Sequence, residues 1–279
     1  MIAVRRAESD ADLELCADIA GAVEPTRPTL DQLRAVREHL LLDRDGGYAY
    51  VNRSSIPGSA YAMVRVLPDR RGRGIGSRLV EAAGGAAREL RCESAWGYVR
   101  PGDEESLRFA AARGFREVGR EVELRRRLVP GEGAIPAGIV ELGDEHRTGA
   151  YAVSVAAVPD MATAGDAEAR SFDEWVEEEL SGVVGFVAVE NGSVAGYATL
   201  EPLGDEPTRL EHGFTGVLPE YRRRGVATAL GQAQIAWAAA RGYGELVTTT
   251  GVTNSALRKQ KAKLGYDEQP GPVLVRGPV

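Results

Sequence analysis

One motif occurs twice in this chain, and the repeat limits what the chain can fold into. Residues 66–76 read V-L-P-D-R-R-G-R-G-I-G, and residues 217–227 read V-L-P-E-Y-R-R-R-G-V-A. The two copies are 151 positions apart, and Gly114-Phe115 and Gly265-Tyr266 keep the same spacing. Ungapped agreement over such a span indicates a duplication, so the sequence predicts two homologous domains. Pro and Gly cluster at 130–136, which places the expected domains at 1–133 and 134–279.

The sequence of each half predicts a mixed α/β domain, with the same order of helices and strands in both. Apolar periodicity and turn signals give the order β-α-α-β-β-β-α-β-α-β. In the second half, Asn191-Gly192 between two alternating apolar runs predicts a hairpin. The first half is 14 residues shorter between its first strand and the motif, so we expect it to have lost about a hairpin's length of chain. The expected fold class is α/β, with two mixed, mostly antiparallel sheets flanked by helices.

Composition narrows the classes of function. The net charge of -7 argues against nucleic acid as the main partner, because nucleic-acid-binding domains are normally basic. No apolar run approaches the roughly 20 residues of a membrane helix, and the first residues show no signal-peptide pattern. Two cysteines and three separated histidines predict neither a disulfide framework nor a metal site. We expect a cytoplasmic protein, without membrane or metal partners, that is a monomer or homodimer.

The repeated motif predicts an anion site at the start of a helix. Gly74 and Gly225 allow a tight turn and let a ligand approach the backbone closely. The first N–H groups of the helix that follows have no partner within it and suit a diphosphate. Arg71 and Arg222 add charged donors. Neither copy is a P-loop, and the first is not G-x-G-x-x-G, because Ser77 stands where the last glycine is needed.

The motif V-x-P-x-x-R-x-x-G-x-G/A, with a following helix and a last helix that ends in G-F or G-Y, resembles the GNAT N-acetyltransferase superfamily. The resemblance covers both halves and implies a tandem arrangement. It implies that each turn holds the diphosphate of the co-substrate acetyl-CoA, beside a strand whose backbone bonds the pantetheine arm. The residues implied for this role are Val217, Arg222, Arg223, Arg224, Gly225, Val226, Ala227, Thr228 and Asn254 in the second half, and Val66, Arg71, Gly72, Arg73, Gly74, Ile75 and Gly76 in the first.

The same resemblance implies that the second half performs the chemistry. In many family members a Glu acts as base eleven residues before the motif Arg, where the second half has Glu211 and the first half has Ala60. His212 is a rival base because its ordinary pKa lies near neutrality. In a regular strand only one of these neighbours can face the cleft. The Tyr that often serves as acid is replaced by Lys261 and Ala110.

The general acid therefore stays unassigned. Lys261 belongs to a basic helix with Arg258, Lys259 and Lys263, and these three lysines are all that the chain contains. We expect Lys261 to lie on a solvated face of that helix. Protonation of the departing thiolate then depends on water, on Lys261 or on a tyrosine not identified by the motif.

The acceptor is constrained by acidic residues around the second helix of the second half. They form either a solvated acidic surface or a site that attracts a cationic amine. The leading hypothesis is acetyl transfer from acetyl-CoA to a primary amine, of a small molecule rather than a protein, by direct attack on the thioester. Two alternatives stay open: a non-catalytic acyl-CoA-binding or sensor protein, and a protein or peptide acetyltransferase. The acidic residues are Asp166, Glu168, Asp173, Glu174, Glu177, Glu178 and Glu179.

Overall fold

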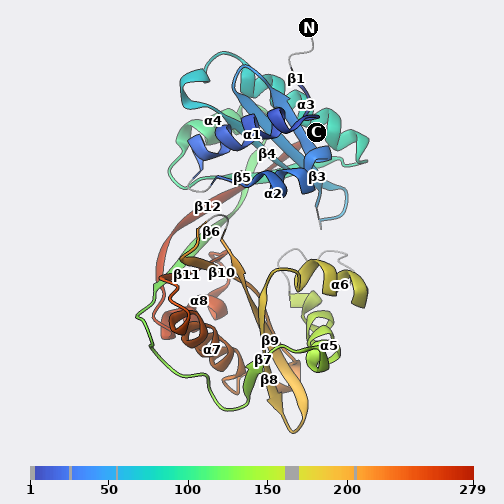
Figure 1. Ribbon diagram of the computed structural model, residues 1–279. Coiled ribbons are helices and arrows are strands. Elements are labelled where there is room, and N and C mark those ends of the chain that lie inside the picture. The colour runs from blue at the N-terminus through green and yellow to red at the C-terminus, as the bar shows by residue number, and fades with distance from the viewer. Residues whose placement is uncertain (1–3, 25–26, 55, 161–169, 204–205) are drawn as a thin grey trace. The chain divides into compact units, whose positions relative to one another are not determined.

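The computed structural model describes residues 4–24, 27–54, 56–160, 170–203 and 206–279 (Figure 1). These residues form two compact units. Unit 1 is Met1–Arg120 with Pro272–Val279, and unit 2 is Glu121–Gly271. Two members of the expected acidic group, Asp166 and Glu168, lie outside the described residues.

Unit 1 is built around a mixed sheet with the strand order β1-β2-β3-β4-β5-β12. Strands β4 and β5 are parallel, and the other neighbours within this sheet are antiparallel. The elements are β1 (Val4–Arg6), α1 (Asp10–Val23), α2 (Leu30–Ala35), β2 (Leu40–Asp43), β3 (Gly47–Arg53), β4 (Ser59–Val66), α3 (Ile75–Glu89), β5 (Ser94–Val99), α4 (Glu104–Ala111) and part of β12 (Asp267–Pro278).

Unit 2 repeats this plan with the strand order β6-β11-β10-β9-β8-β7. Here β10 and β11 are the parallel pair. The elements are part of β6 (Arg116–Arg127), β7 (Ile139–Glu141), α5 (Arg147–Ala157), α6 (Phe172–Glu179), β8 (Val184–Glu190), β9 (Ser193–Pro202), β10 (Arg209–Val217), α7 (Val226–Ala240), β11 (Glu245–Gly251) and α8 (Ser255–Lys263).

The predicted α/β class and order of elements are confirmed for both halves of the repeat. The first half is shorter by about a hairpin's length of chain, but it keeps the hairpin itself. Strands β2, β3 and β4 form the same antiparallel meander as β8, β9 and β10. The shorter length of the first half comes partly from shorter strands, since β2 has 4 residues where β8 has 7, and β3 has 7 where β9 has 10.

The last strand of each half pairs in the unit that the other half builds. Strand β6 comes from the first half, and its residues Glu121–Arg127 pair with β11 of unit 2. Strand β12 comes from the second half, and its residues Val273–Pro278 pair with β5 of unit 1. The residues of the two units therefore differ from the domains expected at 1–133 and 134–279. The expected boundary follows the linker and takes no account of where these two strands pair.

Apolar cores cover both faces of each sheet. In unit 1, α1 packs on one face and α3 on the other, with Leu13 and Leu79 fully buried. In unit 2, α7 covers one face around Leu230, and α5 and α6 cover the other around Trp175. Helix α7 is apolar around most of its circumference, and its core residues are buried accordingly. In the part of the chain that the structure describes, no helix is both long and apolar enough to cross a membrane.

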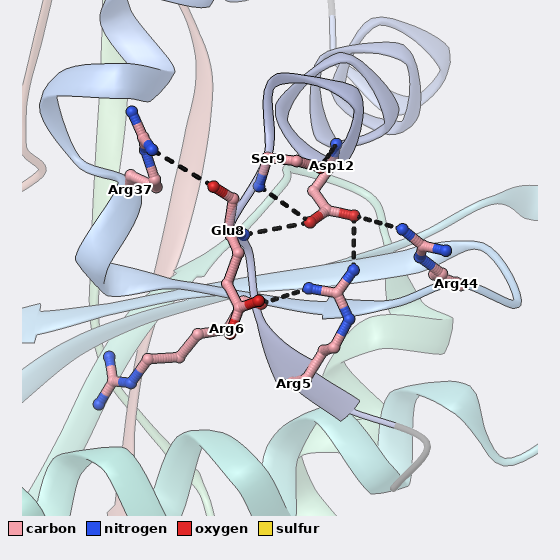
Figure 2. A network of polar contacts seen from close by, with 7 residues as sticks. All are labelled: Arg5, Arg6, Glu8, Ser9, Asp12, Arg37 and Arg44. Atoms are coloured by element: carbon pink, nitrogen blue, oxygen red, sulfur yellow. Dashed lines mark hydrogen bonds and ion pairs between the residues drawn. The ribbon is translucent and has the colours of Figure 1, made fainter. Parts of the chain in front are cut away.

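A buried carboxylate ties the first elements of unit 1 together (Figure 2). Asp12 is 1% exposed, and its Oδ1 accepts hydrogen bonds from Arg5 at 2.7 Å and from Arg44 at 2.8 Å. Its Oδ2 accepts the backbone N–H groups of Glu8 and Ser9, each at 3.1 Å. The Arg5 guanidinium is the main cause that holds the pKa of Asp12 well below its usual range. One side chain thus joins β1, the start of α1 and the turn after β2.

Candidate active site

Both arginine turns lead into a helix at a glycine in the left-handed conformation. Gly74 has a φ of 80° before α3, and Gly225 has a φ of 87° before α7. Glycine enters this region without the steric cost that a Cβ atom imposes. The first N–H groups of each helix have no acceptor within the helix, and the dipole there is positive. Each turn therefore has the local geometry of an anion site.

The two turns differ in strain and in how they are anchored. Gly72 has a φ of 73°, and the matching residue in unit 2, Arg223, has a φ of 61°. A side chain in this region costs about 1–2 kcal/mol, so the second turn is the more strained. Arg222 Nε donates to the Val217 carbonyl at 3.0 Å, which ties that turn to the end of β10. Arg71 instead pairs with a carboxylate of α4 at 3.3 Å.

The expected cofactor residues of each unit lie at the arginine turn and, in unit 2, also at the start of α8. In unit 2, Asn254 caps α8: its Oδ1 accepts the Leu257 N–H at 3.2 Å, and its Nδ2 donates to Thr250 at 3.1 Å. In unit 1, Asp103 caps α4 in the same way. The end of the motif strand, the turn and the first helical turn carry Val217, Arg222, Arg223, Arg224, Gly225, Val226, Ala227 and Thr228 in unit 2, and Val66, Arg71, Gly72, Arg73, Gly74, Ile75 and Gly76 in unit 1.

Unit 1 contains a cavity of about 440 Å³ beside its arginine turn. The parallel pairing of β4 and β5 ends after Tyr61 and Trp96, although both strands continue. Residues of both continuations line the cavity, together with α3, α4 and the end of β12. Its walls are largely apolar, and small residues at Ala83, Gly84 and Ala110 leave the space open. This volume lies within the range of small-molecule sites.

Larger side chains stand at the same three positions of unit 2. Helices α3 and α7 correspond residue for residue at an offset of 151, and α4 and α8 begin at the same offset. The counterparts of Ala83, Gly84 and Ala110 are therefore Gln234, Ile235 and Lys261, which are 1%, 6% and 2% exposed. The two copies of the fold thus differ in what occupies the space between the helices and the parallel strands.

A bulge in β10 changes which residues of the two halves correspond. The pairing of β10 with β9 shifts between His212 and Thr215, whereas β4 pairs with β3 without a shift. In the parallel pairs, Glu211 lies opposite Val247 and Tyr61 lies opposite Trp96. The structural counterpart of Glu211 is therefore Tyr61, and the expectation of Ala60 is wrong by the one residue that the bulge inserts.

Glu211 has the environment of a titratable group at a functional site. It is half-buried and lies directly across from Glu201 of β9. Burial is the largest cause that raises the pKa of Glu211 to about 7, followed by repulsion from Glu201 and Glu123, with Arg209 opposing. Because Leu210 packs in the α7 cluster, alternation along the strand places Glu211 on the face that α5 and α6 cover.

His212 points the other way and belongs to a buried network. Its side chain is 6% exposed, and its two ring nitrogens lie 3.0 Å from Gln234 Oε1 and 2.5 Å from the Tyr266 hydroxyl. The Gln234 amide group donates to the Thr199 carbonyl, so its oxygen accepts, and the histidine Nδ1 carries the proton. Burial lowers the pKa of His212. The structure thus gives the rival base no free acceptor atom in the cleft.

The expectation that Lys261 is solvated is wrong. Its side chain is 2% exposed, whereas Lys259 and Lys263 on the same helix are exposed. Its Nζ lies 4.8 Å from the centre of the Tyr266 ring. Burial lowers the pKa of Lys261 to about 7. Residues 258–263, five of which are polar, gave no signal for this burial, and only the position four residues before Gly265 set Lys261 apart.

In unit 2 the parallel strands part beside a helix start that has the geometry of an anion site, and Glu211 is the last residue of β10 that pairs with β11. The chain belongs to the Acetyltransferase (GNAT) family, whose profile matches residues 29–115 and 151–266. These two matches coincide with the two halves of the repeat. The chain is therefore a tandem member of this family. No curated protein matches it.

Several solved structures share this fold along almost the whole chain. A GCN5-related N-acetyltransferase from Sphaerobacter thermophilus is 20% identical with a TM-score of 0.73, over 99% of this chain and 95% of the other. A tandem GNAT protein from the clavulanic acid biosynthesis pathway is 19% identical with a TM-score of 0.72, over 95% and 93%. A putative acetyltransferase from Pyrococcus horikoshii is 13% identical with a TM-score of 0.62, over 99% and 89%. These likenesses concern the fold alone.

Proposed function

We propose that the protein is an acetyl-CoA-dependent N-acetyltransferase whose chemistry takes place in unit 2, with a primary amine of a small molecule as acceptor. The observation that carries this proposal is Glu211. Its half-buried carboxyl group stands where β10 and β11 cease to pair, and a pKa raised to about 7 suits a base that must take a proton from an ammonium group near neutral pH.

In this proposal the arginine turn holds the co-substrate. The N–H groups at the start of α7 and the Arg222 and Arg224 side chains bind the diphosphate of acetyl-CoA. The thioester then lies near the point where the strands part. Glu211, directly or through a water molecule, removes a proton from the acceptor amine. The amine nitrogen attacks the thioester carbonyl carbon, the C–S bond breaks, and the sulfur leaves with its electron pair. The nitrogen releases its second proton to solvent, so that a neutral amide is formed.

An amine panel with acetyl-CoA, followed by release of free thiol, tests the proposed activity. The substitution Glu211→Gln keeps the shape of the side chain and removes the base, so we expect kcat to fall by about 10²- to 10⁴-fold. Glu190→Gln is the matched control and should keep full turnover. Glu190 lies at the turn of the β8–β9 hairpin, whereas Glu201, which faces Glu211, lies at the open end of that hairpin. A Glu211→Gln enzyme with wild-type kcat would remove Glu211 from this role.

Matched substitutions in the two turns test which unit performs the transfer. We expect Arg222→Ala with Gly225→Ala to abolish turnover, because the second turn holds the reacting thioester. The double variant Arg71→Ala with Gly74→Ala should keep a substantial part of the wild-type turnover. The reverse result would move the chemistry to unit 1.

A second candidate, binding of acyl-CoA without chemistry, is favoured for unit 1 by its cavity. The cavity adjoins Arg71, Gly72 and Gly76, while Tyr61 replaces the carboxyl group. Calorimetric titration with acetyl-CoA counts the sites. Filling the cavity with Gly84→Ile, which copies Ile235 of unit 2, should remove one of two sites. Gly85→Ile on the adjacent residue, outside the cavity lining, is its control.

A further inference from the structure

Lys261 is a buried amino group that no described carboxylate neutralises. Among the residues that the structure places, it forms no ion pair and no side-chain hydrogen bond, and its Nζ lies over the face of the Tyr266 ring. Lysine is rarely buried without such a partner, because desolvation of an ammonium group is costly. A side chain held in this state is a candidate for a functional role.

Two contacts connect Lys261 to the point where the parallel strands of unit 2 part. Its Nζ lies over Tyr266, and the Tyr266 hydroxyl contacts His212, which directly follows the last residue of β10 that pairs with β11. The corresponding residue of unit 1, Ala110, lines the cavity between β4, β5 and the helices. Lys261 therefore extends from α8 into the part of unit 2 that matches this cavity.

Lys261 and Glu211 approach the same point from opposite faces of the sheet. Glu211 lies on the face of α5 and α6, and the His212–Tyr266 contact that adjoins Lys261 lies on the face of α7. A thioester placed between the two strand ends would expose its carbonyl carbon to an amine on the first face. Its sulfur would then leave toward the second face.

We propose that Lys261 is the proton donor to the CoA sulfur in unit 2, which deepens and rests on the proposed acetyltransferase function. As the C–S bond breaks, the electron pair stays on sulfur and one proton passes from Nζ to it. CoA leaves as the thiol, and Lys261 remains as a neutral amine until solvent returns the proton. Glu211 meanwhile holds the proton taken from the acceptor.

The acidity of Lys261 suits this transfer. Burial lowers its pKa to about 7, while a free thiol has a pKa of about 8.5, so transfer to the thiolate is favourable by roughly thirtyfold. The titratable groups that face Lys261 are His212 and Tyr266. Burial lowers the pKa of His212 and raises the pKa of Tyr266. Both stay neutral near pH 7. The charges of Arg126 and Glu132 have opposite effects on the pKa of Tyr266: Arg126 lowers it and Glu132 raises it.

The test replaces Lys261 by methionine, which fills similar space and carries no proton. We expect Lys261→Met to keep its affinity for acetyl-CoA within about threefold and to lose about 10²- to 10³-fold in kcat. In the wild type, kcat should fall above about pH 7 as Lys261 loses its proton, and this alkaline limb should disappear in Lys261→Met. Removal of a buried charge should leave the melting temperature equal or higher, which excludes misfolding as the cause.

Two variants on the same helix are the controls. Lys259→Met and Lys263→Met remove exposed ammonium groups from α8 and should keep both kcat and the alkaline limb. Lys261→His restores an ionisable donor and should recover part of the rate. If Lys261→Met turns over at the wild-type rate with an unchanged alkaline limb, the donor role is wrong, and the acetyltransferase proposal stands.

A measurement without an acceptor separates the two proposals. The ultraviolet absorbance of the thiolate follows the titration of bound CoA, and an ammonium group beside the sulfur should lower its midpoint in the wild type relative to Lys261→Met. A lower midpoint supports the contact even if no amine is acetylated. Equal midpoints with CoA bound in unit 2 would overturn it.

Discussion

The repulsion between Glu211 and Glu201 gives a prediction whose size can be worked out from the sheet. The two residues are directly opposite on adjacent antiparallel strands, so their Cβ atoms lie about 5 Å apart and their carboxyl groups about 6 Å apart. With an effective dielectric constant of about 40, between those of interior and solvent, the repulsion is about 1.4 kcal/mol. This equals about one pKa unit. Burial also raises the pKa of Glu201. Glu201 is therefore partly protonated, which reduces its repulsion of Glu211.

Glu201→Gln should therefore shift the pKa of Glu211 downward from about 7 by roughly half to one unit. The base acts when ionised, so the acidic limb of kcat/KM moves to lower pH. At pH 6 the ionised fraction, and with it the rate, should rise roughly threefold to fivefold, while at pH 8 the change stays below about twofold. The assay is the pH dependence of kcat/KM from 5 to 9, with Glu190→Gln as control. A limb that stays in place or moves upward would refute the electrostatic reasoning.

Two further predictions concern stability. Asp12→Ala removes four hydrogen bonds of a buried carboxylate and should cost about 2–4 kcal/mol, or roughly 6–12 °C in the melting transition of unit 1. Because the pKa of Asp12 is lowered in the folded state, its contribution to stability is present above about pH 4 and fades as the pH falls further. The difference in stability between wild type and Asp12→Ala should therefore shrink in acid. A difference independent of pH would contradict this. His212→Leu removes the hydrogen-bond partner of Gln234 Oε1 and of the Tyr266 hydroxyl and should cost about 2–4 kcal/mol. The acidic limb of kcat/KM should not shift, and loss of that limb at full stability would restore His212 as base.

The repeat in the sequence was enough to predict the order of elements and the two turns. Apolar periodicity, Asn191-Gly192 and the glycines at the helix starts each report local conformation, and local conformation is what a sequence pattern encodes most directly. The resemblance also pointed to Glu211, through its spacing of eleven residues before Arg222. The counterpart Ala60 was wrong because a bulge leaves no composition signal and shifts a strand by one residue.

The burial of Lys261 and the pairing of β6 and β12 depend on tertiary contacts that no local pattern shows. The helix of Lys261 is strongly polar, and four of its residues at 258–263 are basic, so periodicity favoured a solvated face. The neighbour that accommodates Lys261 is Tyr266, at the start of the last strand. Strands β6 and β12 show the same alternation of buried and exposed residues near their ends, and a free sheet edge can accept either as a partner.

The exchange of the last strands has a consequence for how the chain can be made. Unit 1 includes Pro272–Val279, which follow the whole of unit 2 in the sequence, so its sixth strand is missing until unit 2 has been translated. Multidomain chains commonly fold one domain after another as they emerge, and here the first unit waits with β5 as an open edge. Cutting the chain at 133/134 would separate each half from the strand that completes its own sheet. Joint expression of the two halves, rather than either alone, is the route to an intact protein.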